Sequence, residues 1–184
     1  MRFVILLVLL LPVTVCAQTF DFNIRDDAAW VRYAKLVDER SFGQIELDGT
    51  AYFADNGRRS VGVGMHIVDN AYTAETPVYV GLGGRLLWLD SGPLSGGVLA
   101  LGGHGRYTLP AADRVSVGAH LYFAPGILSF GRADSYFEFA ARGEYQVLQS
   151  SWVYLGYRRA RVGFNNFATR TIDSGLHIGM RIQF

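Results

Sequence analysis

The sequence predicts an all-β fold: an antiparallel up-and-down transmembrane β-barrel of eight strands, with ten as the alternative and with the usual right-handed strand twist. Three observations support this prediction. The chain begins with a secretory signal, its later part alternates apolar and polar residues with period two, and short turn sequences separate the alternating segments. Antiparallel strands joined by short hairpins close readily into a small barrel, which leaves no unpaired sheet edge.

Residues 1–17 have the features of a cleaved signal peptide. Arg2 supplies the positive charge, an apolar run follows, and Val15-Cys16-Ala17 forms the cleavage site. Val15 stands where a lipoprotein signal carries a small residue, which argues against lipid attachment at Cys16.

The mature chain is electrically balanced. Cleavage removes Arg2 from the 17 basic residues, which leaves 16 basic against 16 acidic residues. This balance argues against nucleic acid as a partner. Cleavage also removes the single cysteine, so disulfides and thiolate chemistry are excluded.

Residues 18–42 are the hardest part of the chain to interpret. Phe20, Phe22 and Ile24 alternate briefly with polar residues. Residues 28–37 fit either a short helix with an aspartate N-cap or a strand. We therefore expect a periplasmic cap, a plug, or an additional hairpin that would raise the strand count to ten.

Residues 43–184 form the predicted barrel. Asp55-Asn56-Gly57 is a strong hairpin signal, and a tight turn is expected at Gln149-Ser150. The eight predicted strands are Gly43 to Ala54, Ser60 to Val68, Val78 to Trp88, Val98 to Tyr107, Arg114 to Phe123, Ser135 to Val147, Trp152 to Val162 and Ile172 to Phe184.

Three features of the strands predict that their polar face points into the barrel. Glycine is frequent on that face, as a narrow interior requires; charges of both signs occur there; and aromatic residues cluster near strand ends, as in interfacial girdles. The apolar face would then contact outer-membrane lipid. We expect the interior charges to pair across the lumen, in a network of Glu46, Asp48, Arg85, Arg106, Glu138, Arg142, Glu144, Arg158 and Arg181.

Three stretches follow one another in the later strands: L-Y-F-A-P-G, Y-F-E-F-A-A-R-G-E-Y and L-G-Y-R-R, of which the first and last are the most specific. With the glycine-rich strands before them, they resemble the YfaZ family of outer-membrane proteins over nearly the whole mature chain. The resemblance implies a β-barrel located in the cell outer membrane, and it implies no activity. The terminal Phe184 also resembles the carboxy-terminal signal that the outer-membrane assembly machinery binds, so this machinery is an expected partner.

The sequence contains no motif that predicts an enzyme, a cofactor or a metal site. His66, His104, His120 and His177 lie on the polar face of four different strands, so we interpret them as isolated hydrogen-bonding residues. There is no G-x-S-x-G motif, and Asp173-Ser174 is the one faint catalytic candidate. Two functions are consistent with this reading: a closed or narrow salt-bridged barrel with a structural or surface-interaction role, or a narrow porin-like channel for small polar solutes.

Overall fold

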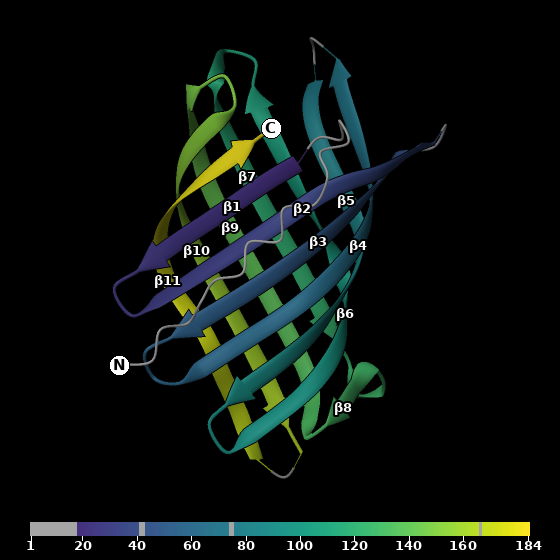
Figure 1. Cartoon of the computed structure of the whole chain (residues 1–184), viewed down its shortest axis with the longest axis vertical. Coiled ribbons are helices and arrows are strands. Elements are labelled where there is room, and N and C mark those ends of the chain that lie inside the picture. Colours follow the sequence, from purple (N-terminus) through teal and green to yellow (C-terminus); the bar gives the residue numbers. More distant parts are fainter. Residues whose placement is uncertain (1–17, 41–42, 74–75, 166) are drawn as a thin grey trace.

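The computed structural model describes residues 18–40, 43–73, 76–165 and 167–184, which form one closed barrel (Figure 1). The expected signal peptide lies outside these residues. In the described part of the chain, ten long strands make up the wall: β1 (Gln18–Arg25), β2 (Ala28–Arg40), β3 (Gly43–Ala54), β4 (Arg58–Thr73), β5 (Thr76–Ser91), β6 (Leu94–Leu109), β7 (Ala112–Ala124), β9 (Ala133–Leu148), β10 (Ser151–Phe164) and β11 (Phe167–Gln183).

Each long strand pairs antiparallel with the long strands before and after it in the chain, and β1 pairs with β11 to close the barrel. At this seam the Gln18 N–H donates to the Phe184 carbonyl at 2.8 Å, and the Phe184 N–H donates back at 3.0 Å. We call this the terminus end of the barrel. At the opposite, loop end, the 3-10 turn η1 (Gly126–Leu128) and the short strand β8 (Ser129–Gly131) extend the connection between β7 and β9, and β8 pairs with β6. None of the described residues forms a helix that is long and apolar enough to span a membrane.

The preferred count of eight strands is wrong, and the ten-strand alternative is confirmed. The additional hairpin is β1–β2, so the barrel begins at Gln18 instead of residue 43. The helical interpretation of residues 28–37 is also wrong, because β2 pairs with β1 on one side and β3 on the other. Trp30 and Ala34 are both buried in the lumen, whereas Tyr33 is exposed.

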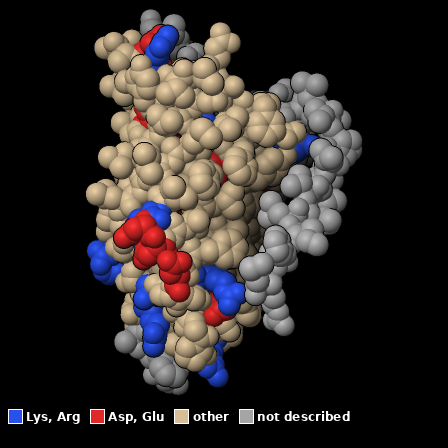
Figure 2. Space-filling view, turned by 60° about the vertical axis from the view of Figure 1, so that its left-hand side comes forward, with Lys and Arg blue, Asp and Glu red and all other residues tan. Residues whose placement is uncertain are grey.

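The outer face of the barrel is apolar. Side chains such as Val63, Ile67, Leu82 and Leu176 each expose more than 60% of their surface. On the face seen in Figure 2, a wide band in the upper half shows few charged atoms, and charged side chains gather in the lower half, toward the loop end. An exterior of this kind matches a hydrocarbon environment and not water.

The lumen has two halves with different chemistry. Toward the loop end, buried apolar side chains contact one another across the barrel axis. This apolar plug consists of Trp30, Tyr52, Leu87, Leu89, Leu94, Val98, Ala100, Tyr122, Ala124, Ala133, Tyr136, Ala160, Val162, Phe164 and Ile172. Toward the terminus end, charged and polar side chains occupy most inward positions of the same strands. Glu138 lies where the two halves meet, in register with Tyr122 and Ala160 of the plug.

Candidate functional site: a charged lumen

The predicted network residues all lie on the inner side of the barrel wall. Seven of the nine are buried: Glu46, Asp48, Arg85, Glu138, Glu144, Arg158 and Arg181. Arg106 and Arg142 are partly buried and line a cavity. The inward position follows from the period of two in each strand, which places every second side chain in the lumen.

Glu144 on β9 organises the first cluster of charges. It accepts hydrogen bonds from Arg142 at 2.7 Å and from Arg181 at 2.8 Å. Arg142 also donates to Asp21 at 2.5 Å, and Asp21 accepts a second bond from the Tyr154 hydroxyl. The cluster therefore joins β9, β10, β11 and β1 across the barrel seam.

Glu138, also on β9, organises the second cluster. It accepts hydrogen bonds from Arg158 at 3.0 Å and from the Tyr136 hydroxyl, and it lies 2.8 Å from His120 Nε2. The guanidinium of Arg158 also lies 3.4 Å from an oxygen of Asp173. Each charge is thus compensated, as a buried ion pair requires.

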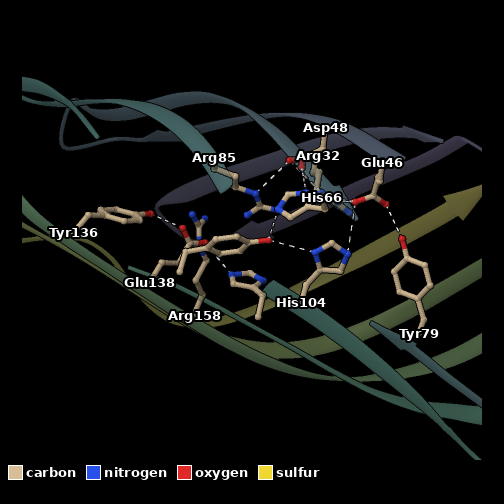
Figure 3. A network of polar contacts seen from close by, with 12 residues as sticks. Arg32, Glu46, Asp48, His66, Tyr79, Arg85, His104, Tyr136, Glu138 and Arg158 are labelled. Atoms are coloured by element: carbon tan, nitrogen blue, oxygen red, sulfur yellow. Dashed lines mark hydrogen bonds and ion pairs between the residues drawn. The ribbon is translucent and has the colours of Figure 1, made fainter. Parts of the chain in front are cut away.

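Glu46 and Asp48 on β3 form the third cluster (Figure 3). Arg32 donates to Glu46, the Tyr79 hydroxyl donates to Glu46 at 2.9 Å, and Arg85 Nε lies 3.3 Å from Asp48 Oδ1. Asp48 and Arg85 reach each other across β4 at Gly64, where a Cβ atom would lie only 2.4 Å from Asp48 Oδ2.

The interpretation of the histidines as isolated residues is wrong for two of them. The rings of His66 and His104 have centroids 5.0 Å apart. The Tyr122 hydroxyl lies between them, 2.9 Å from His66 Nε2 and 3.2 Å from His104 Nδ1. Sequence spacing does not reveal this cluster, because the two histidines lie on β4 and β6, the strands on either side of β5.

A cavity of about 600 Å³ occupies the lumen beside these clusters. Its lining runs from Thr19 and Gln183, beside the seam at the terminus end, to Trp30 at the edge of the apolar plug. Six arginines contribute to the lining: Arg32, Arg85, Arg106, Arg142, Arg158 and Arg181. Two of them contact Trp152, since the guanidinium carbons of Arg181 and Arg106 lie 3.9 and 5.6 Å from the centre of its ring.

The sequence prediction missed Asp21 and Arg32, two charged members of these clusters. Both belong to residues 18–42, for which a hairpin of the barrel is only one of three predicted alternatives. The alternation of Asp21 and Asn23 with Phe20 and Phe22 was the available signal, and its shortness concealed it.

A closed antiparallel barrel with an apolar exterior and a charged lumen is an outer-membrane-type β-barrel. The chain belongs to the YfaZ family, whose sequence model, described as YfaZ precursor, matches residues 3–184. This confirms the predicted family. No curated protein matches the chain. Among solved structures, the chain is similar to one described as "KdgM porin", with 12% sequence identity, a TM-score of 0.48, and coverage of 91% of this chain and 99% of that chain.

Proposed function

We propose that this protein is an outer-membrane barrel whose lumen is closed, so that solutes do not pass through it from one side of the membrane to the other. In this proposal it has a structural or surface-interaction role and no catalytic activity. In this proposal the terminus end faces the periplasm and the loop end faces outside. The longer connection that contains η1 and β8 lies at the loop end, which fits the usual pattern of short periplasmic turns and longer external loops.

The apolar plug is the observation that carries this proposal. Leu89, Val98 and Val162 are fully shielded from water within it. A polar solute that crossed this region would lose its hydration without gaining polar partners, which costs several kcal/mol for each buried polar group, roughly 2–7 by transfer measurements. The plug therefore supports a closed barrel more strongly than a conduit.

The geometry around Asp173-Ser174 supports a non-catalytic role. Asp173 is buried and pairs with Arg25 at 2.9 Å, whereas Ser174 is exposed and contacts the Tyr157 hydroxyl at 3.2 Å. The two side chains lie on opposite faces of β11, so they cannot act together on one substrate.

The channel alternative relies on the arginine-lined cavity. The cavity gives a polar path through the lumen from the terminus end as far as the plug. Conduction through the whole barrel would require displacement of the plug. Planar-bilayer recording of the refolded mature protein separates the two functions. We expect no steady single-channel current from the parent protein at either polarity.

A plug variant serves as the positive control for this recording. Leu89→Ala combined with Phe164→Ala should thin the plug and produce brief openings, provided that heat-dependent electrophoretic mobility shows a folded barrel. Steady currents from the parent, with a conductance unchanged in the double variant, would contradict the closed-barrel proposal.

A further inference from the structure

In the cluster of His66, His104 and Tyr122, the N–H and O–H hydrogens are one fewer than the polar contacts that need a donor. Neutral His66 and His104 carry one N–H each, and Tyr122 carries one O–H. Each imidazole uses one nitrogen for the Tyr122 hydroxyl and directs the other toward a carboxylate. Four contacts thus compete for three hydrogens, and one imidazole lone pair is left facing a carboxylate oxygen.

Glu46 is the carboxylate that the remaining nitrogens of both imidazoles approach. His104 Nε2 lies 3.6 Å from Glu46 Oε1, and His66 Nδ1 lies 3.9 Å from the same oxygen. Both nitrogens are buried without a hydrogen-bond partner among the described residues. His66 Nδ1 is also 3.0 Å from Asp48 Oδ2, and this contact is not aligned as a hydrogen bond.

These separations suit a shared cation better than direct contact. Ligands about 2.0–2.1 Å from a tetrahedral Zn²⁺ ion lie roughly 3.3 Å from one another. One atom from each of the three residues lies within 4.8 Å of the other two, and the separations from Glu46 Oε1, 3.6 and 3.9 Å, are near the tetrahedral spacing. Side-chain rotations that bring the two imidazole nitrogens together would close the site around an ion.

From this geometry we propose that Glu46, His66 and His104 form a binding site for a divalent transition-metal ion of the Zn²⁺ type. Two imidazoles and one carboxylate are ligands that such ions prefer. The Tyr122 hydroxyl orients both rings, the role that groups outside the ligand set have in metal sites. Glu46 and His104 line the cavity, so the ion enters from the terminus end and its fourth coordination position faces the cavity.

Two arginines set the electrostatic conditions at this site. Arg32 donates to Glu46 Oε1, and both Arg32 and Arg85 lie near Asp48. A carboxylate oxygen has two lone pairs, so Oε1 can keep the Arg32 N–H and still face an ion. The arginines nevertheless reduce the attraction for a cation, and Arg32→Gln should therefore strengthen metal binding.

Isothermal titration calorimetry of the tag-free mature protein with ZnCl₂ tests the site directly. We expect one equivalent of Zn²⁺ to bind, and a chelator to reverse both the binding and the accompanying rise in the urea midpoint. His104→Gln should weaken Zn²⁺ binding at least roughly 100-fold, and Tyr122→Phe, which keeps all three ligands, should weaken it about 10- to 100-fold.

His177→Gln is the matched control, because His177 lines the same cavity and lies outside the cluster. It should bind Zn²⁺ as the parent does. Absence of saturable Zn²⁺ binding to the folded parent would overturn the proposal. It would indicate that a proton, and not a metal ion, lies between the imidazole and the carboxylate. Equal loss of affinity in the His104 and His177 variants would also overturn it. The parent titration decides the question even where a variant fails to fold.

Discussion

The two halves of the lumen fill the same barrel by different means. In the half toward the loop end, apolar side chains exclude water by their volume. In the half toward the terminus end, charged side chains are buried because each carboxylate has arginine, histidine or tyrosine partners. Apolar packing tolerates an imperfect neighbour at the cost of a cavity, whereas a charged cluster tolerates no missing partner. This difference determines where substitutions should harm the fold most.

The largest effect is expected from breaking the charge pair of Glu138 and Arg158, which lies where the two halves of the lumen meet. Glu138→Ala leaves Arg158 buried without its main partner, and we expect a loss of about 3–5 kcal/mol in the free energy of unfolding. Urea unfolding of the refolded protein, followed by tryptophan fluorescence, measures this loss. Adding Arg158→Ala should recover part of it, because no unpaired charge then remains. If the double variant loses the sum of the two single losses, the residues do not act as a pair.

A somewhat smaller effect is expected in the plug. Leu89→Ala removes a fully buried side chain and should cost about 2–5 kcal/mol by the same measurement. Leu86→Ala on the same strand is the control, because Leu86 is half exposed on the outer face, where lipid can fill the space. Equal losses in the two variants would contradict the division between plug and lipid-facing surface.

The close approach of Asp48 and Arg85 at Gly64 gives a third test. Gly64→Ala places a methyl group against both side chains and should cost about 1–3 kcal/mol, as overpacking does. Gly49→Ala is the control, because it is the same substitution at a site where no atom outside its chain neighbours lies within 4 Å of the added Cβ. A Gly64 variant as stable as the Gly49 variant would show that the contact across β4 can relax.

The smallest effect is expected at the rim of the loop end, where water reaches the charges. The hydrogen bond from Arg25, 2.5 Å long, lowers the pKa of Asp27 in the β1–β2 turn below its ordinary value of 3.8. Because the folded pKa is lowered, the contact contributes stability above about pH 4 and loses it as the pH falls through the folded pKa. A carboxyl-detected NMR titration should show a midpoint for Asp27 below 3.8, and Arg25→Gln should raise it. An unchanged midpoint in that variant would refute the assignment to Arg25.

Sequence alternation predicted the charged half of the lumen better than the apolar half. Glu138, Arg142 and Glu144 stand between outward apolar residues, so their inward position was readable. In the plug the inward residues are also apolar, which erases the alternation: Leu86-Leu87-Trp88-Leu89 is one continuous apolar run. The weak alternation predicted for Val98 to Tyr107 has the same origin, because Val98 and Ala100 belong to the plug.

The cross-strand partners were less predictable than the directions of the side chains. Register decides which charges meet, and register depends on closure of the whole sheet. Asp21 meets Arg142 only because β1 pairs with β11, two strands away from β9. The histidine cluster likewise depends on curvature that no single strand encodes.

The seam between β1 and β11 has a consequence for how this barrel folds. Neighbouring hairpins can form locally, but the seam joins the first and last described strands, the pairing with the longest loop to close. Until it forms, two strand edges present unpaired backbone groups, each of which costs several kcal/mol in lipid. Insertion and closure are therefore coupled, and removal of β1 should stall folding at an open, aggregation-prone sheet even though the other nine long strands are intact.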